Sequence, residues 1–591
     1  MPIAHDAFKT EISKLVLEEI KNIGTQYSIQ ITTTENDILN LLSIPPDFSL
    51  GQAALPCFPF AKQLRQAPNK IAEILAQNIN LKLKNYIQEA TATNAYLNFT
   101  VNFQNLFPHL LNKVEKDASF KQEFLEKNEK EKIVVEYSQP NTHKAMHVGH
   151  LRCLVLGDTV CNLLDYAGHT TIRATYPGDI GTHVAKIVWY LTHPTKKELP
   201  KENKAQWLGH MYAKADEDLK SFKDKPEEVE IKKDIAEILK QISQKSGSYF
   251  ELWQETRQWS LNYLQGIYDW LNSKFDVWYF ESECDAPSKE LVKKKFEEGF
   301  FVKDNGAIGI DLSQWKLGFA MYLKSDGNGL YQTKDLDLIS KKFADPTVTK
   351  SIYVVDARQK FHFDQLFKTA ELMGYHQAAK STHLSYETVN TEQGTPFSSR
   401  ELNGLGLLEL KEKMEEKVTA EYLERYRNNW TDEEIKETAK NVTIGALKYG
   451  MLRVDNNTQI HFSLNEWLRL DGETGPYLQY VHARCASILQ KLGSYSHPFH
   501  AEFSHKEEKQ LFFLISRFNE FSLQAAAQCR PSILANYLYD LAKQFNRFYE
   551  ACSIKESTGE SKNTRLALVF MTKKAIWNGL QLLGIPALEK M

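Results

Sequence analysis

The sequence predicts an α/β fold, in which a doubly wound parallel sheet with a helical insertion is preceded by a small α/β domain and followed by an all-α bundle. Short β-branched runs such as residues 133–135 alternate with stretches of helical periodicity through the middle of the chain. Beyond about residue 405 the periodicity is helical only. The 591 residues are also about twice what one hydrophobic core allows, so several domains are required.

The composition is that of an ordinary globular protein and limits the partners it can have. Hydrophobic residues make up 42% and charged residues 25%, and a formal net charge of −3 leaves any nucleic-acid binding to local basic surfaces. Seven scattered cysteines without a C-x-x-C pair predict a reducing cytoplasm, with neither a disulfide framework nor a zinc site. The acidic N-terminal stretch and the lack of an apolar run of about 18 residues predict no signal peptide and no membrane span.

Residues 1–125 predict a small α/β module. Apolar residues recur at helical spacing over residues 12–23, and the alternation over residues 27–31 predicts a strand. A helix is expected to start at Pro68, and residues 95–101 read as a further strand. From composition alone this module is a packing domain.

The most informative part of the chain is a strand, a loop and a helix that begins with two histidines. The strand is expected at residues 133–135 and the helix near His147, Gly149 and His150, with a second strand at residues 170–175. The first N–H groups of a helix lack partners within the helix and therefore bind anions. Two imidazoles can donate to phosphate oxygens, and Gly149 lets a nucleoside come close. The pattern predicts a nucleoside triphosphate site; the alternative is a pair of histidines that only satisfy the helix start.

After this unit the chain becomes helical and polar before strands return. Residues 191–300 predict a helical insertion between the two halves of the sheet, with aromatic side chains in its core. We expect the sheet to resume at residues 319–324 and to include a buried strand at residues 351–355.

A helix expected to start at Tyr331 carries an acid on the same face. Tyr331 and Asp335 are four residues apart and therefore neighbours on that face. A carboxylate at the mouth of a cleft suits a guanidinium, whose planar fork pairs with it bidentately. The alternative is an acid that only interacts with the helix macrodipole.

Two motifs in the central region resemble those of a known family. The pattern S-x-P-N-x-x-K-x-x-H-V-G-H-L-R is followed by G-D-x-G-T over residues 178–182. These motifs are similar to those of the arginyl-tRNA synthetases, a family of class I aminoacyl-tRNA synthetases, and the resemblance covers essentially the whole chain. The matching residues of the first motif are Ser138, Pro140, Asn141, Lys144, His147, Gly149, His150, Leu151 and Arg152.

The resemblance implies an amino-acid site and a nucleotide site. The arginine-binding residues are expected to be Asn141, Tyr331, Asp335 and Gln359. The ATP-binding residues are expected to be Lys144, His147, Gly149, His150, His362, Ser398, Ser399 and Arg400. His362 has the alternative of being simply a packed histidine.

The segment Thr395-Pro396-Phe397-Ser398-Ser399-Arg400 departs from the family pattern. It stands where class I synthetases carry the loop K-M-S-K-S, and Pro396 and Ser399 replace both lysines. Those charges offset the negative charge that develops on the leaving pyrophosphate. Many arginine enzymes with this loss carry a lysine just upstream of the histidine motif, the place of Lys144. We therefore expect Lys144, His147 and His150 to be the catalytic residues.

The C-terminal part resembles the family's anticodon-binding helical bundle. The pattern F-N-x-F-Y-E and basic residues interleaved with aromatic ones suit unstacked bases and phosphates. The residues expected to bind tRNA are Tyr537, Lys573, Lys574 and Trp577. Without the resemblance, the aromatic residues would be core and the lysines would serve solubility.

The resemblance also implies the domain boundaries. They are 1–125 for an N-terminal domain that touches the tRNA, 126–405 for a Rossmann-like catalytic domain with the connective insertion at 191–300, 406–470 for a helical connector and 471–591 for the anticodon-binding bundle.

The activity implied is that of an arginine–tRNA ligase. ATP and L-arginine would give arginyl-adenylate, and the arginyl group would pass to the terminal ribose of tRNA(Arg), with Mg²⁺ neutralising the triphosphate and no metal site built by the protein. We expect a cytoplasmic monomer that needs bound tRNA to activate arginine. The alternatives are a cysteinyl or glutamyl synthetase and a non-catalytic tRNA-binding paralogue.

Overall fold

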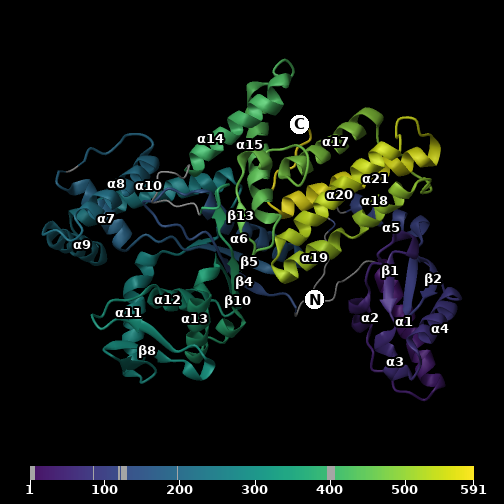
Figure 1. The fold of residues 1–591 in the computed structure, drawn as a ribbon, viewed down its shortest axis with the longest axis horizontal. Coiled ribbons are helices and arrows are strands. Elements are labelled where there is room, and N and C mark those ends of the chain that lie inside the picture. The colour runs from purple at the N-terminus through teal and green to yellow at the C-terminus, as the bar shows by residue number, and fades with distance from the viewer. Residues whose placement is uncertain (1–6, 84, 117–119, 121–128, 196, 396–405) are drawn as a thin grey trace. The chain divides into compact units, whose positions relative to one another are not determined.

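The computed structural model describes residues 7–83, 85–116, 120, 129–195, 197–395 and 406–591. The chain forms two compact units, shown as parts of one ribbon in Figure 1. Unit 1 comprises Met1–Glu126, Tyr477–Leu582 and Pro586–Met591, and unit 2 comprises Lys127–Pro476 and Leu583–Ile585.

Unit 2 is organised around a five-stranded parallel sheet. Its strands, in spatial order, are β11 (Thr382–Tyr386), β10 (Val348–Asp356), β4 (Lys132–Glu136), β5 (Thr170–Thr175) and β6 (Val277–Trp278). The chain moves from β4 to one side through β5 and β6, then crosses to the other side for β10 and β11, and every neighbouring pair is parallel. This is the predicted doubly wound sheet. In such sheets ligands bind at the carboxyl ends of the strands, where the order reverses, here between β4 and β10.

Helix α6 (Val148–Ala167) connects β4 to β5. It is buried on nearly all sides, which explains why its apolar residues follow one another so closely. Gly157 is required because a Cβ there would lie 2.2 Å from the Tyr137 ring. Gly168 ends the helix at φ 106°, in the left-handed region that suits glycine.

A group of helices follows β5. It consists of α7 (Thr182–Thr192), α8 (Lys204–Ser221), α9 (Glu227–Gln244) and α10 (Ser248–Trp270). Val184, Val188, Ile238 and Trp253 are buried together in its core, and Figure 1 shows these helices gathered beside one another. The predicted insertion at 191–300 also includes β6, which pairs with β5, and α11 (Glu281–Glu297), so part of this range belongs to the parallel sheet.

The prediction that residues 319–324 resume the parallel sheet is wrong. They form β9 (Phe319–Leu323), which pairs antiparallel with β8 (Ala307–Asp311), and β8 pairs antiparallel with β7 (Val302–Asp304). The reason is a local hairpin: Asn305 (φ 48°) and Gly306 (φ 85°) form the two-residue turn between β7 and β8. An apolar run does not reveal whether its partner is near or distant in the sequence, whereas this Asn-Gly pair does.

Other predicted elements of unit 2 are confirmed. The helix at Tyr331 is α12 (Tyr331–Lys342), and the strand at residues 351–355 lies within β10. After Gln359 the chain forms α13 (Lys360–Leu372).

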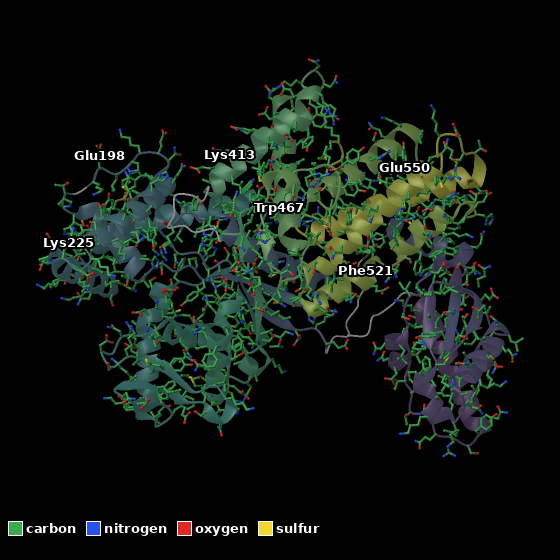
Figure 2. The ribbon with its side chains drawn as sticks, viewed as in Figure 1. Glu198, Lys225, Lys413, Trp467, Phe521 and Glu550 are labelled. Carbon is green, nitrogen blue, oxygen red and sulfur yellow. The ribbon has the colours of Figure 1, made fainter. Side chains whose placement is uncertain are left out.

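The end of unit 2 is helical and includes one short two-stranded ladder. The helices are α14 (Leu407–Val418), α15 (Asp432–Leu452) and α16 (Leu464–Trp467), and the ladder joins β12 (Val389–Asn390) to β13 (Ile460–His461). Trp467, labelled in Figure 2, packs so closely on α15 that a Cβ on Gly450 would come within 2.4 Å of the indole.

The first part of unit 1 is a three-stranded antiparallel sheet with helices. Its elements are α1 (Ala7–Gln26), α2 (Glu35–Leu41), β1 (Ala53–Pro56), α3 (Phe58–Leu64), α4 (Pro68–Asn80), β2 (Ile87–Thr93), β3 (Tyr96–Val101) and α5 (Phe103–Lys116), with the strand order β1-β3-β2. The predicted strand at residues 27–31 is wrong. Tyr27 is half exposed, and the Ile29 amide donates to the Gly24 carbonyl at the end of α1. The two isoleucines of this segment, which created the alternation, are only partly buried.

The rest of unit 1 is the predicted helical bundle. Its helices are α17 (Gly475–Leu492), α18 (Lys506–Ser516), α19 (Phe518–Gln528), α20 (Pro531–Ala551) and α21 (Gly559–Leu582). Leu511, Leu538, Phe545 and Ile576 are fully buried in its core. Across the described residues of the whole chain, none of the helices combines the length and apolar character needed to cross a membrane.

Candidate active site

A cavity of about 270 Å³ lies at the carboxyl edge of the parallel sheet. One wall comes from the segment between β4 and α6 together with the first turns of α6, and the other from the ends of β10 and β11 and the residues after them. The lining residues are Ser138, Gln139, Pro140, Met146, His147, Gly149, His150, Cys153, Asp356, Arg358, Tyr386, Thr388 and Val389. The cavity therefore lies where a doubly wound sheet binds its ligand.

His147 and His150 stand at the N-terminus of α6, in the wall of this cavity. His147 is the N-cap residue, and its Nδ1 accepts the Gly149 amide at 3.1 Å. The Nδ1 of His150 accepts the His147 amide at 3.2 Å, and the two ring centroids are 4.0 Å apart. Because Nδ1 is an acceptor in both rings, each neutral imidazole carries its proton on Nε2, where the N–H is a donor.

Both imidazoles are neutral at physiological pH. Burial lowers the pKa of His147 to about 4, and burial together with the neighbouring His147 and Lys144 lowers the pKa of His150 to about 3. Neutral imidazoles can donate hydrogen bonds to phosphate oxygens, but they cannot offset the negative charge of a triphosphate.

Lys144 lies in the loop that precedes α6 and is half-buried. Its Nζ lies 4.6 Å from the centre of the Tyr212 ring on α8, at cation–π distance. Lys144 is not among the residues that line the cavity. A flexible four-carbon side chain separates its charge from the backbone, so movement of this side chain is sufficient to carry the charge elsewhere.

Asp335 and His362 meet between α12 and α13. His362 Nε2 donates to Asp335 Oδ2 at 2.7 Å, and both side chains keep about a fifth of their surface exposed. His362 was expected at the ATP site, but it does not line the cavity, and its bond to Asp335 favours a place beside the predicted amino-acid site instead. Tyr331 is 73% exposed, and Gln359 is exposed at the start of α13.

Asn141 meets the second motif at Gly178. The Thr142 amide donates to the Gly178 carbonyl at 2.9 Å, and the Gly178 amide donates to the Pro140 carbonyl at 3.1 Å. A Cβ on Gly178 would lie 2.4 Å from Asn141 Oδ1, so the glycine allows this close approach. The next residue, Asp179, is fully buried and binds Arg257 Nε of α10 at 2.7 Å.

The sequence analysis missed an acid beside this point. Glu281, at the start of α11, lies near Gly178 and forms an ion pair with Lys334 of α12 at 2.5 Å. Burial raises the pKa of Glu281 despite the nearby Lys334. Nothing in the local sequence marks Glu281, because it comes from a helix about a hundred residues after the motif.

The sequence analysis also missed the second wall of the cavity. Asp356 ends β10 and Arg358 follows it, and Tyr386 ends β11 and is followed by Thr388 and Val389. Asp356 Oδ1 accepts Arg358 Nε at 2.8 Å. A signal was available, because residues that directly follow parallel strands lie at the ligand-binding edge of the sheet.

The remaining predicted site residues include a group that the structure does not describe and one residue that is buried. Ser398, Ser399 and Arg400 lie outside the described residues. Tyr537, predicted to contact tRNA, is covered in this structure: its side chain is 3% exposed, stacks on Phe521 at 4.6 Å and donates to the Leu514 carbonyl.

The other three predicted tRNA-binding residues lie on or near the surface of α21. Lys573 binds Glu589 at 2.7 Å, and Lys574 lies 5.8 Å from the Phe570 ring. Trp577 is 38% exposed, so its indole is accessible to a stacking partner.

Comparisons with known proteins agree with this architecture. Residues 113–464 match the catalytic domain of the class I (R) tRNA synthetases, residues 478–591 the DALR anticodon-binding domain and residues 6–101 the arginyl-tRNA synthetase N-terminal domain. The doubly wound sheet, the histidine pair at its ligand-binding edge and the helical bundle are those of a class I aminoacyl-tRNA synthetase.

Individual relatives narrow this class. The arginine–tRNA ligase of Bdellovibrio bacteriovorus is 41% identical over the full length of both chains, and that of Clostridioides difficile is 31% identical over 99% of this chain and all of its own. The solved arginyl-tRNA synthetase of Thermus thermophilus, 26% identical, superposes with a TM-score of 0.79 over 97% of this chain and 99% of its own. The chain belongs to the arginyl-tRNA synthetase family.

Proposed function

We propose that this protein is an arginine–tRNA ligase, which uses ATP to activate L-arginine and then transfers the arginyl group to tRNA(Arg). The observation that carries the proposal is a pair of neutral imidazoles at the N-terminus of α6, in the wall of a cavity at the ligand-binding edge of a doubly wound sheet. Full-length identity of 41% to an arginine–tRNA ligase supports the same conclusion.

In the nucleotide site, His147 and His150 donate their Nε2 protons to phosphate oxygens. Gly149 leaves room for the nucleoside, and Lys144 leaves the Tyr212 ring to approach the triphosphate. Ser398, Ser399 and Arg400 are additional candidate phosphate contacts.

In the amino-acid site, Asp335 accepts the arginine guanidinium, with Tyr331 and Gln359 beside it. His362 donates to one oxygen of Asp335 and so orients the carboxylate. Asn141 serves the amino and carboxyl end of the substrate. A shorter or neutral side chain would leave the acid without a partner, which gives strong selectivity at a single site and removes the need for hydrolytic editing.

The reaction has two steps. A carboxylate oxygen of arginine attacks the α-phosphorus of ATP, forming the acyl–phosphate bond of arginyl-adenylate and releasing pyrophosphate. The 2′-hydroxyl of the terminal tRNA ribose then attacks the activated carbonyl, and AMP leaves as the hydroxyl proton is lost. Positioning and electrostatic stabilisation account for the rate, and the protein forms no covalent intermediate.

Mg²⁺ is expected to accompany the ATP. Among the described residues, no group of three or more histidine, cysteine, aspartate or glutamate side chains is placed to hold a metal ion. Phosphate oxygens and water would therefore be its ligands, and the charge neutralisation it supplies would add to that of Lys144.

The tRNA is expected to bind before arginine is activated, with Lys573, Lys574 and Trp577 of α21 among its contacts. We infer that the protein works as a monomer in the cytoplasm.

The test is ATP–pyrophosphate exchange with each amino acid in turn, with and without tRNA. Of the amino acids tested, only arginine should support exchange, and it should do so only when tRNA is present. Exchange with cysteine or glutamate but not arginine would overturn the proposal in favour of another class I enzyme. No exchange with any amino acid, in a protein that still binds tRNA, would indicate a non-catalytic paralogue.

A further inference from the structure

The motif residue Arg152 is buried and donates to four main-chain carbonyls of the described part of the chain. It lies on α6 and is 2% exposed. Its Nη1 donates to the carbonyls of Glu387 and Thr458, both at 2.7 Å. Its Nη2 donates to the carbonyls of Asp455 and Asn456 at 3.1 and 2.9 Å. One side chain thus holds four carbonyls from two segments that are far apart in the sequence.

Both segments belong to the second wall of the nucleotide cavity or support it. Thr388 and Val389 line the cavity. Arg152 holds the carbonyl of Glu387, the residue before Thr388, and Val389 belongs to the β12–β13 ladder. The Glu387 amide donates to the Asn456 carbonyl at 2.9 Å, and the Ile460 amide donates to the Thr388 carbonyl at 3.1 Å. The stretch at 455–461 therefore supports the lining stretch at 386–390, and Arg152 fastens both to α6.

The same helix carries the opposite wall. His147 and His150 form that wall at the first turn of α6, and Arg152 follows His150 by two residues. We propose that Arg152 is a positioning residue of the nucleotide site: it fixes the spacing between the two imidazoles and the wall at 386–390. This inference rests on the proposed function, because it takes ATP to be the occupant of the cavity.

The chemistry requires arginine at this position. A guanidinium presents five N–H donors in a planar fork, whereas the three donors of a lysine radiate from a single nitrogen and cannot span two separate segments. Burial lowers the pKa of Arg152 to about 10, so it remains charged at neutral pH and attracts the carbonyl dipoles. Hydrogen bonds from a charged donor are stronger than those between neutral groups. Because the acceptors are main-chain carbonyls, these bonds do not depend on which side chains the loops carry.

The test compares Arg152→Lys with Arg173→Lys. Arg173 anchors the other end of α6 by donating to Asp165 at 2.8 Å and Asn162 at 3.1 Å, so its replacement loosens the same helix far from the cavity. In tRNA-supported exchange, Arg152→Lys should raise the KM for ATP about tenfold and leave the KM for arginine within about twofold. Arg173→Lys should lower the melting temperature without changing either KM. Equal changes in both KM values, or a lower melting temperature with an unchanged KM for ATP, would overturn the proposal.

A second variant covers the case in which Arg152→Lys does not fold. Ile460→Pro removes the amide that donates to the Thr388 carbonyl and loosens the same wall without touching Arg152. It must give the same selective rise in the KM for ATP, and a wild-type value would overturn the proposal. Calorimetric titration with ATP alone distinguishes a failure of the proposed ligase activity from a failure of the proposed role of Arg152. A wild-type protein that binds ATP but activates another amino acid would defeat the proposed function and leave the role of Arg152 testable by ATP affinity.

Discussion

At the scale of single residues, the two histidines of the proposed phosphate site supply no positive charge. Burial keeps His147 and His150 neutral, so they offer directed N–H donors and no charge. Arg358 lines the cavity, but its charge is already matched by a bidentate contact with Asp356. Lys144 rests against the face of Tyr212, a weaker partner than a carboxylate, and is therefore the residue whose charge is most easily given to a ligand.

Replacing Lys144 by alanine should lower the rate of ATP–pyrophosphate exchange by about 10²–10³, the effect of removing one preorganised electrostatic donor. Steady-state exchange with saturating arginine and tRNA measures it. Lys204→Ala is the matched control, since Lys204 also rests on an aromatic ring, with its Nζ 4.8 Å from Trp259. We expect that control to retain wild-type activity and Ser399→Ala to lose far less than Lys144→Ala. Losses of similar size for Lys144 and Ser399 would assign the main charge stabilisation to the loop.

Replacing Asp335 by asparagine should lower kcat/KM for arginine by about 10²–10³, because the guanidinium would then be desolvated without a charged partner. The KM for ATP should stay within about twofold. Asp337→Asn is the control, since Asp337 lies two residues further along α12 and pairs with Lys341 on the same helix. If kcat/KM for arginine falls equally in both variants, the loss reflects a disturbed α12 and not the removal of the carboxylate that binds the substrate.

At the scale of elements, four histidines at or near the N-termini of α6 and α7 have pKa values that burial lowers. Burial is the main cause that lowers the pKa of His143 and His150 to about 3 and of His147 and His183 to about 4. His143 lies between the hydroxyls of Thr142 and Thr256, each at 2.9 Å. These interactions favour neutral rings, so protonation opposes the folded arrangement.

The stability of the protein should therefore decrease as the pH falls below about 6.5. An unfolded histidine binds its proton near pH 6.5 while the folded one does not until pH 4 or 3, so the unfolded state gains protons over this window. At pH 5.5 each such histidine should lower the free energy of unfolding by about 1 kcal/mol. Urea unfolding at pH 7.5, 6.5 and 5.5 measures this. His143→Gln should flatten the dependence, and replacement of the exposed His376 by Gln should not. Equal stability at pH 7.5 and 5.5 would contradict the prediction.

The elements that the sequence predicts well are those whose signal is local. The run at residues 133–135, the histidines at the helix start and Gly168 at its end define strand, helix and cap within about forty residues. The helix that starts at Tyr331 is predicted from an equally local signal, the residues of its own first turn.

The elements that the sequence does not predict depend on which distant segments meet. The run at residues 319–324 has the composition of a core strand, yet its partner is the neighbouring hairpin. Tyr537 is of a residue type that stacks on bases, yet α18 and α19 cover it. Glu281 lies beside Gly178 because the neighbouring Ser282, at the start of α11, donates to Asp179, and no pattern in the sequence brings those residues together.

At the scale of the whole molecule, the proposed sites for ATP and arginine lie in one unit and the proposed tRNA contacts in the other. The nucleotide cavity and the Asp335–His362 pair lie in unit 2, whereas Lys573, Lys574 and Trp577 lie in unit 1. Each unit has its own core, so a surface substitution in unit 1 should leave the geometry of the catalytic site intact. Effects on tRNA and effects on ATP are therefore expected to separate.

Replacing Trp577 by alanine should raise the KM for tRNA(Arg) about tenfold, because stacking of a base on an indole contributes about 1–3 kcal/mol. The KM values for ATP and arginine, measured at saturating tRNA, should not change. Trp315→Ala is the matched control, since Trp315 is 36% exposed, against 38% for Trp577, and lies in unit 2. Tyr537→Phe should also leave the KM for tRNA unchanged, because its ring is buried and the substitution removes only the hydroxyl that donates to Leu514. Aminoacylation with varied tRNA decides between these outcomes. If Trp577→Ala behaves like the control while Tyr537→Phe weakens tRNA binding, the RNA-binding surface is not the exposed face of α21, and the bundle must rearrange to expose its core when it binds tRNA.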